Sequence, residues 1–151
     1  MKHLAAILAL VASAAVASAE NWPCWRGPRG DGTSAETGIP TRWSATENVL
    51  WKTPIPGVSH ASPIVWGDRV FLVSAVEGTE GRDLFSLDAA SGKILWLRTV
   101  VKSPFEKKHK LNSHASSTPA TDGRLVYVAF LDVQDMVVAA YDFDEIGRAH
   151  V

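Results

Sequence analysis

The chain has 151 residues, a net charge of −1 at neutral pH and 46% hydrophobic residues, which is enough for one average domain. The near-neutral charge gives no attraction for nucleic acid or for an anionic membrane surface, so neither is expected as a partner. Short apolar stretches are separated by turns rich in glycine and proline, and no helical period persists after the N-terminus, so we predict an all-β fold.

The N-terminal segment 1–19 has the three parts of a secretory signal peptide. A basic start is followed by an apolar core (Leu4 to Val16) that is short for a membrane span, and Ala17-Ser18-Ala19 forms a small-x-small cleavage site. The alternative, an N-terminal anchor helix, is less favoured for these reasons. We expect cleavage after Ala19, a secreted or periplasmic location in the cell envelope, and no transmembrane segment in the mature chain.

Residues 20–47 are expected to form an irregular lead-in, because turn-forming residues dominate and no strand or helix period persists. Three tryptophans, Trp22, Trp25 and Trp43, are candidates for docking this lead-in onto a larger body. Cys24 is the only cysteine, so it cannot form an internal disulfide. We interpret it as a half-buried single thiol.

Short predicted strands follow one another from residue 48 to residue 144. They lie in the ranges 48–55, 62–76, 82–100, 117–130 and 135–144, and Gly- or Asp-containing turns divide several of these ranges into hairpins. Residues 100–112 are interpreted as a loop insertion. The charged run from Glu106 to Lys110 within it is expected to be a solvated loop.

The strand region is internally repetitive. A Ser-His-Ala-Ser tetrapeptide occurs twice, at residues 59–62 and 113–116, and the neighbouring strands align at similar offsets. Aligned positions include Val70 with Val126, Phe71 with Tyr127, Leu84 with Val138, Asp88 with Asp142, and Leu50-Trp51 with Leu95-Trp96. Units of about 45 residues with four short strands each are typical of β-propeller blades.

The stretch LFSLDAASGKILW (84–96) predicts the closing hairpin of such a unit. Asp88 can accept hydrogen bonds from the backbone that follows it, and Gly92 can adopt a positive φ at the end of the turn. The next strand then places Trp96 where its ring can lie between adjacent blades and its indole N–H can reach a backbone carbonyl.

This stretch resembles the repeat of the PQQ-like, or quinoprotein-dehydrogenase-like, propellers. The matching residues are Leu87, Asp88, Gly92, Lys93 and Trp96. The lead-in is also similar to the N-terminal part of secreted bacterial proteins of this type, although glutamine is expected where Cys24 stands. The resemblance implies a propeller of four-stranded antiparallel blades, of which residues 48–144 would supply roughly two, incompletely.

The C-terminal segment 145–151 does not continue the repeat. After Asp144 the pattern predicts Gly-Lys and then Trp, whereas the chain reads EIGRAHV. One reverse translation of this segment matches a widely used sequencing adapter. We therefore expect that this tail is non-native and that the chain is an N-terminal fragment; resequencing the gene would test both points.

His60 and His114 are the main ligand candidates, because they occupy equivalent positions in the two Ser-His-Ala-Ser segments. They could bind an anionic ligand or a metal at the propeller mouth, but no clear third metal ligand accompanies them. Neighbouring serines suggest a serine hydrolase, yet there is no nucleophile elbow and no acid that would orient either histidine. A structural role for both is favoured.

No catalytic or metal-binding set can be assigned on the residues present. The resemblance implies PQQ and Ca²⁺ as cofactors only for the enzymes of the family, and the repeat alone does not imply either. We therefore expect a non-catalytic binding or scaffold propeller that contacts other envelope proteins or a small ligand. The alternative is a periplasmic PQQ-dependent dehydrogenase whose catalytic residues lie in other blades.

Overall fold

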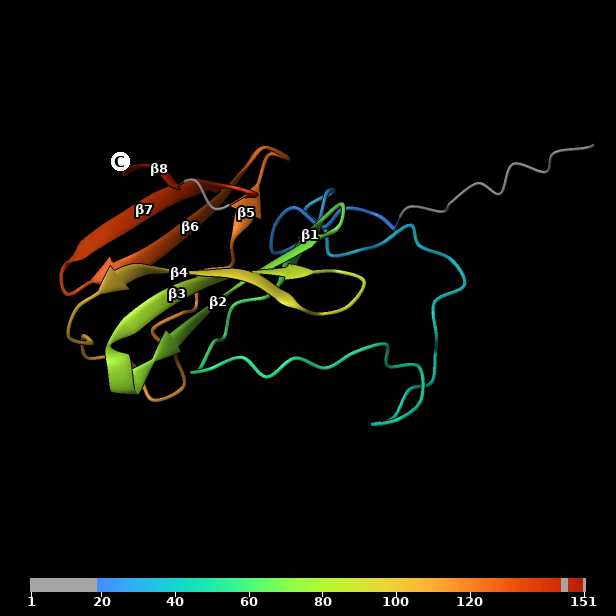
Figure 1. The fold of residues 1–151 in the computed structure, drawn as a ribbon, viewed down its shortest axis with the longest axis horizontal. Coiled ribbons are helices and arrows are strands. Elements are labelled where there is room, and N and C mark those ends of the chain that lie inside the picture. The colour runs from blue at the N-terminus through green and yellow to red at the C-terminus, as the bar shows by residue number, and fades with distance from the viewer. Residues whose placement is uncertain (1–18, 145–146, 151) are drawn as a thin grey trace, which may run out of the picture.

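The computed structural model of the chain describes residues 19–144 and 147–150 (Figure 1). Its strands are β1 (Ile64–Trp66), β2 (Arg69–Val76), β3 (Gly81–Asp88), β4 (Ile94–Lys102), β5 (Ala120–Thr121), β6 (Leu125–Asp132), β7 (Asp135–Asp142) and β8 (Gly147–His150). One short 3-10 helix, η1 (Glu77–Thr79), joins β2 to β3. The described part contains no α-helix, so the predicted all-β class is confirmed.

Two predictions fall largely or partly beyond the described residues. The predicted signal peptide lies outside them except for Ala19, and so do residues 145, 146 and 151 of the predicted non-native tail. The remaining tail residues form the edge strand β8, whose backbone pairs with β7. Within the described part of the chain, no helix has the length and apolar character needed to cross a membrane.

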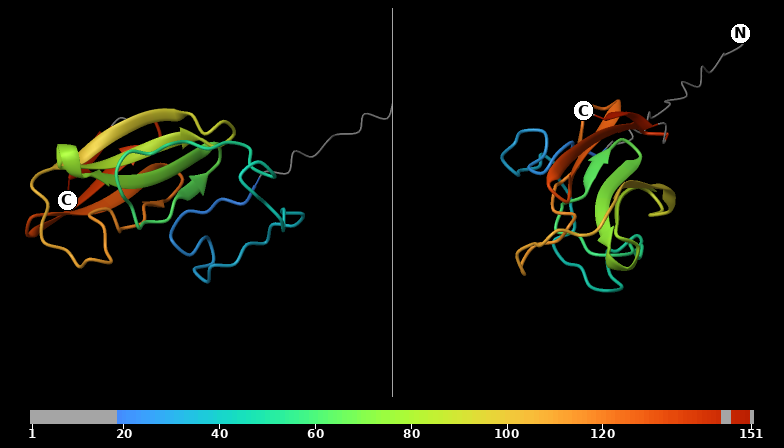
Figure 2. Two further views of the ribbon diagram at one scale, coloured as in Figure 1. Left: turned by 90° about the horizontal axis from the view of Figure 1, so that it is seen from below. Right: turned by 90° about the vertical axis from the view of Figure 1, so that its left-hand side faces the viewer.

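The strands form two antiparallel sheets of four strands each, in the orders β1-β2-β3-β4 and β5-β6-β7-β8. Within each sheet, every strand therefore pairs with its neighbours in sequence, as the predicted hairpins require. Figures 1 and 2 show the two sheets lying against each other, with the loop between β4 and β5 at one end. We call them the first and second sheet.

The predicted strand over residues 48–55 is wrong. No regular strand forms there; the segment instead crosses the first sheet, from the β3–β4 turn to β2. Side chains hold it at the turn: the Trp51 indole N–H donates to Ala89 O at 2.9 Å, and Thr53 Oγ1 donates to Gly92 O at 2.6 Å. A strand needs a neighbouring strand for its backbone groups, and none is present on either side of this segment among the described residues.

The β3–β4 turn has the predicted tight geometry. Asp88 Oδ1 accepts hydrogen bonds from the backbone N–H and the hydroxyl of Ser91, and the Gly92 N–H donates to Asp88 O at 2.8 Å. Gly92 has φ +70°, and a Cβ there would lie 2.3 Å from the Trp51 ring. Glycine is therefore needed both for the backbone conformation and for the contact with Trp51.

The two sheets pack through non-equivalent faces. In the first sheet, alternate residues form a front face that packs against the second sheet and a back face that lies under the segment 51–56. Front-face residues in the shared core are Phe71, Val73, Ala75, Leu84 and Trp96, and those of the second sheet are Val126, Val128, Phe130 and Ala139. Since Val126 aligns with Val70 of the first sheet's back face, the second sheet presents its own back face to the core.

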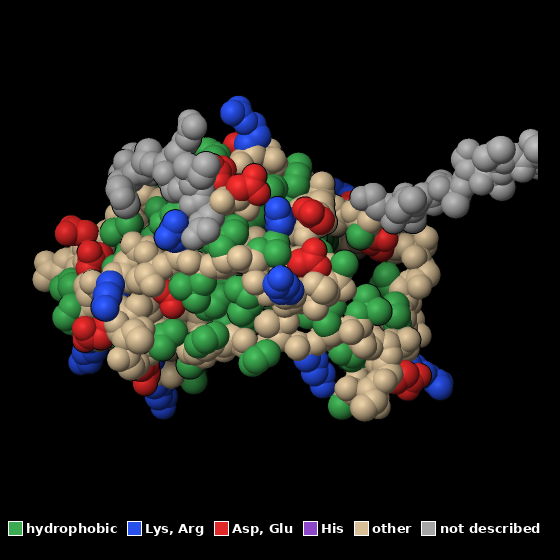
Figure 3. All heavy atoms as spheres, viewed as in Figure 1, with side chains coloured by type: hydrophobic (Ala, Val, Ile, Leu, Met, Phe, Trp, Pro, Cys, Tyr) green, Lys and Arg blue, Asp and Glu red, His purple; other side chains and the backbone are tan. Residues whose placement is uncertain are grey.

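The front face of the second sheet is uncovered in the described structure. Its residues include Tyr127, Leu131, Met136 and Val138, of which Leu131 is 40% and Met136 71% exposed. On the back face of β4, the hydrophobic side chain of Leu97 is also exposed. Figure 3, which has the view of Figure 1, shows hydrophobic side chains across the middle of the molecule.

Residues of the lead-in join the edge strands β1 and β5 of the two sheets. Trp22 forms two backbone hydrogen bonds with Val65 of β1, and Pro23 O accepts a hydrogen bond from the Thr121 N–H of β5. The rest of the lead-in is mostly exposed, with Trp25 66% and Trp43 73% accessible to solvent. Of the three predicted docking residues, only Trp22 therefore contacts the sheets through a hydrogen bond in the described part.

Candidate functional site

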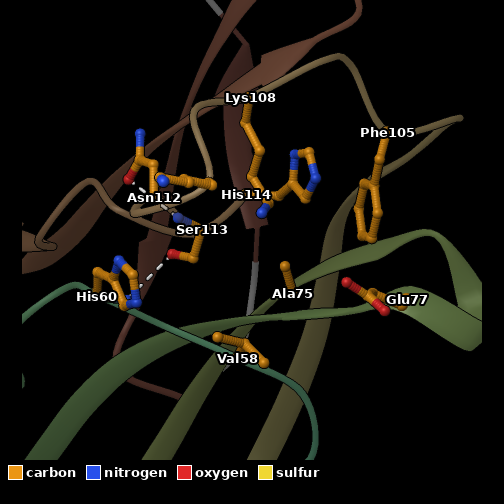
Figure 4. Close-up of a pocket in the computed structure, with 10 residues that line it drawn as sticks. Val58, His60, Ala75, Glu77, Phe105, Lys108, Asn112, Ser113 and His114 are labelled. Carbon is orange, nitrogen blue, oxygen red and sulfur yellow. Dashed lines mark hydrogen bonds between the residues drawn. The ribbon is translucent and has the colours of Figure 1, made fainter.

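A cavity of about 240 Å³ opens at the end of the first sheet where the β4–β5 loop folds back (Figure 4). Its walls come from the end of β2 and the following residues, from Val58, and from the β4–β5 loop. The lining residues are Val58, His60, Ala75, Glu77, Phe105, Lys108, Lys110, Asn112, Ser113 and His114. The structure thus brings the two predicted ligand candidates, His60 and His114, to the same cavity.

The β4–β5 loop is fixed by a buried arginine on β3. Arg82 is fully buried, and its guanidinium forms an ion pair with Glu106, lies 4.7 Å from the centre of the Phe105 ring and donates to Ser103 O at 3.2 Å. A buried arginine needs a paired charge and hydrogen-bond partners. Glu106 and Ser103 supply both for the terminal N–H groups, whereas Nε has no hydrogen-bond partner among the described residues. Arg82 therefore holds the loop in place through three successive contacts.

Glu106 links this arginine to His114. The His114 Nδ1 lies 3.1 Å from Glu106 Oε1, and the imidazole stacks on the Phe105 ring with the centres 4.1 Å apart. The His114 side chain is only 8% exposed. Because a carboxylate accepts hydrogen bonds, this contact favours the histidine form with a proton on Nδ1 and fixes the plane of the ring.

The pKa of Glu106 reflects opposing influences. Burial acts to raise it, but the hydrogen bond with His114 and the hydrogen bond and charge of Arg82 outweigh burial, so the pKa lies below its ordinary value of 4.5. Glu106 is therefore ionised at neutral pH, and the Arg82–Glu106 pair carries no net charge.

The backbone of His60 is hydrogen-bonded to the second Ser-His-Ala-Ser segment. Its N–H donates to Ala115 O at 3.1 Å and to Ser113 Oγ at 3.1 Å, and Figure 4 shows Ser113 between the two histidines. The Ser59 hydroxyl donates to the same Ala115 carbonyl at 3.0 Å. The two Ser-His-Ala-Ser segments are thus hydrogen-bonded to each other, and the hydroxyls of Ser59 and Ser113 bond to backbone groups. This use favours a structural role for the serines over nucleophilic catalysis.

Positive charge dominates the rim of the cavity. Lys108 and Lys110 are exposed lining residues, and Glu77 is the acidic one. Figure 4 shows Lys108 and Asn112 across the cavity from Glu77. The apolar surface between them comes from Val58, Ala75 and the Phe105 ring. This combination can accommodate a small molecule with an anionic group and an apolar body.

Sequence reasoning missed the acid that orients His114. Glu106 was expected to be part of a solvated loop, but its side chain is 15% exposed and contacts both Arg82 and His114, so that expectation is wrong for this residue. It holds for Lys107 to Lys110, which are exposed. The available signal was Arg82 itself, since a cation inside an apolar strand needs a carboxylate partner.

The repeat-motif residues lie at the opposite end of the first sheet. Leu87 is buried and Lys93 is exposed in the β3–β4 turn region, and the Trp96 indole N–H donates to Phe143 O of the second sheet at 2.9 Å. The Trp96 ring also lies 6.0 Å from Phe71. Trp96 therefore connects the two sheets, and none of the repeat-motif residues lines the cavity.

Three tryptophans of the strand region contact turns or loops of the two sheets. Trp51 and Trp96 are used in packing on turns, and the Trp66 ring lies against Gly123. No group of three or more His, Cys, Asp or Glu side chains in the described ranges is placed to share a metal ion. Cys24 is a half-buried free thiol, and its Sγ lies 3.3 Å from Gly27 O.

Comparisons with protein-family models, with curated proteins and with solved structures each gave no match for this chain. The resemblance to the PQQ-like repeat therefore stays a prediction from the sequence motif.

Proposed function

We propose that the chain is part of a secreted β-propeller of the PQQ-like repeat class that acts as a non-catalytic binding or scaffold protein in the bacterial cell envelope. The observation that carries the proposal is a repeated contact between units. Trp51 donates to Ala89 O in the turn of the first sheet, and Trp96 donates to Phe143 O after β7 of the second, both at 2.9 Å.

These two contacts join equivalent positions. Trp51 aligns with Trp96, and Ala89 aligns with Phe143, so each tryptophan binds the turn of the sheet that follows it in sequence. The front-to-back packing of the sheets supports the same arrangement. In a two-sheet sandwich the core is formed by the two inner faces, whereas units that repeat around an axis pack one face against the opposite face of the next.

A binding or scaffold role is favoured because the one cavity described above has a rigid wall and an open, cationic rim but no assembled nucleophile, base and oxyanion donors. The dehydrogenase remains the second candidate. It is supported by the motif resemblance around Trp96, not by any residue at the cavity.

The enzymatic alternative places the catalytic residues in other blades, so it is tested on the complete propeller, reconstituted with PQQ, Ca²⁺ and an electron-accepting dye. We expect no dye reduction with a panel of alcohols and sugars, and no quenching of tryptophan fluorescence by PQQ beyond that of free tryptophan. Turnover that depends on both PQQ and Ca²⁺ would overturn the scaffold proposal.

The proposed export is tested separately by expressing the whole chain in a bacterium with a general secretion pathway. We expect a periplasmic product whose N-terminal residue is Glu20, since cleavage is predicted after Ala19. An uncleaved product retained in the cytoplasm would contradict a location in the envelope.

A further inference from the structure

We propose that the cavity at the β4–β5 loop binds a small-molecule carboxylate with an apolar body. This inference names a ligand class for the binding role proposed above and rests on it. The residues that would recognise the carboxylate are Lys108, Lys110 and Asn112, and those that would contact the apolar body are Val58 and Phe105.

The charge of the cavity favours an anion. The buried acid nearest to it, Glu106, is neutralised by Arg82, so the net contribution of that pair is zero. Two lysines then face a single lining carboxylate, that of Glu77. Hydrogen bonds between ammonium groups and a carboxylate are charge-assisted and stronger than neutral ones, and Asn112 offers a further N–H donor.

The apolar wall favours an organic acid over an inorganic anion. The Phe105 ring contacts both the Arg82 guanidinium, 4.7 Å from its centre, and the His114 ring, which stacks on it with the centres 4.1 Å apart. This stack fixes one wall before any ligand arrives, which reduces the entropy lost on binding. His114, whose side chain is 8% exposed, lines the cavity as part of the same fixed wall.

The cavity size limits the ligand to a small molecule. A volume of about 240 Å³ lies below the range of pockets that accept drug-sized ligands. A carboxylate carried on a single ring or a short chain fits this description, and its expected affinity is modest, with a Kd of about 1 mM.

The test is calorimetric titration of the whole chain at low salt with three probes. Benzoate supplies a carboxylate on an apolar ring, inorganic phosphate supplies an anion without apolar surface, and benzylamine supplies the ring with the opposite charge. We expect saturable binding of benzoate, binding of phosphate at least about fivefold weaker because it forgoes the apolar contact, and no binding of benzylamine.

The variants place this binding at the cavity. Lys108→Met combined with Lys110→Met should weaken benzoate binding about tenfold or more, because both charge-assisted contacts are lost. Lys107→Met is the matched control: it removes the same charge from an exposed neighbour that does not line the cavity, and affinity should stay within about twofold.

Three results would overturn the proposal: no saturable benzoate signal, phosphate binding as tight as benzoate binding, or equal weakening in the Lys107 variant. None of these results depends on dye reduction or on export. If the protein binds benzoate at this cavity and also shows PQQ-dependent turnover, the carboxylate site stands and the scaffold proposal fails. The failure of the site and the failure of the proposed function can therefore be distinguished.

Discussion

The two sheets share a strand order and a repeat, yet they differ in how much of each is covered. In the first sheet, β3 has seven of its eight residues buried, because the second sheet covers one face and the segment 51–56 covers the other. In the second sheet, β6 alternates between buried and partly exposed residues, and the front face is open. Burial therefore reflects the position of a sheet in the stack, since the repeat makes both faces apolar in either sheet.

The sharpest way to test this difference is to shorten aligned aromatic residues. Phe71→Ala should lower the free energy of unfolding by about 3–5 kcal/mol, because Phe71 is fully buried between the sheets. Tyr127→Ala, at the aligned position on the open face, should cost about 1 kcal/mol, chiefly through the hydrogen bond to Asp122. Urea unfolding measures both; equal losses would mean that the faces are not distinct.

A second comparison concerns Arg82 and the aligned Met136, the first fully buried and the second 71% exposed. Glu106→Gln should destabilise the chain by about 3 kcal/mol in the same urea assay, because it leaves the buried guanidinium without its countercharge. The control Glu47→Gln alters an exposed glutamate and should have an effect near zero. A loss that is no larger for Glu106 would show that the loop is not anchored through Arg82.

The same carboxylate predicts how stability depends on pH. The pKa of Glu106 is lowered in the folded chain, so its contribution is complete above the ordinary value of 4.5 and is lost as the pH falls through the lowered pKa. Thermal unfolding of the unmodified chain and of Glu106→Gln should therefore differ most near neutral pH and converge in acid. A difference that stays constant down to about pH 2 would contradict this assignment.

The contact between the segment 51–56 and the first sheet can be broken at a glycine. Gly92→Ala should cost about 2–4 kcal/mol, from the positive φ and from the clash with the Trp51 ring. Gly30→Ala is the control: its φ of +69° is nearly the same, but nothing lies within 4 Å of the added Cβ, so only the backbone term of about 1 kcal/mol remains. If the two losses are equal, Trp51 does not bind this turn in solution.

The smallest expected effect lies on the open face of the second sheet. Met136→Lys should change the free energy of unfolding by less than about 0.5 kcal/mol, because the side chain is exposed. It should nevertheless reduce binding of a hydrophobic fluorescent dye, since it places a charge in the apolar surface around Leu131 and Val138. A large loss of stability would instead show that this face is covered in solution.

The hairpins could be predicted because their signals are local. Asp88, Ser91 and Gly92 lie within five residues, and the turn they form depends on their own hydrogen bonds. The contact of the Trp96 indole N–H with a backbone carbonyl was predicted from the place of Trp96 in the repeat. The turn needs no knowledge of distant parts of the chain, whereas the Trp96 contact joins residues 47 apart and needed the comparison of repeats.

The errors arose where long-range contacts decide the outcome. Residues 48–55 have the composition of a strand, but the structure offers them a surface to cross and no neighbour with which to pair. Glu106 looks solvated beside three lysines, yet its partner Arg82 lies 24 residues earlier in the chain. Local pattern could not indicate either arrangement, because both depend on which surfaces the sheets leave available, and Arg82 signals a carboxylate partner without saying which one.

The order of the two tryptophan contacts has a consequence for how the chain reaches its native state. Trp51 precedes the turn it binds by 38 residues, and Trp96 precedes its carbonyl partner by 47. Each sheet is a meander that can form from short-range pairings. Each indole hydrogen bond, by contrast, can form only after its partner further along the chain has been synthesised. During vectorial emergence from a ribosome or a translocon, the sheets would therefore dock in sequence, from the N-terminal unit onward.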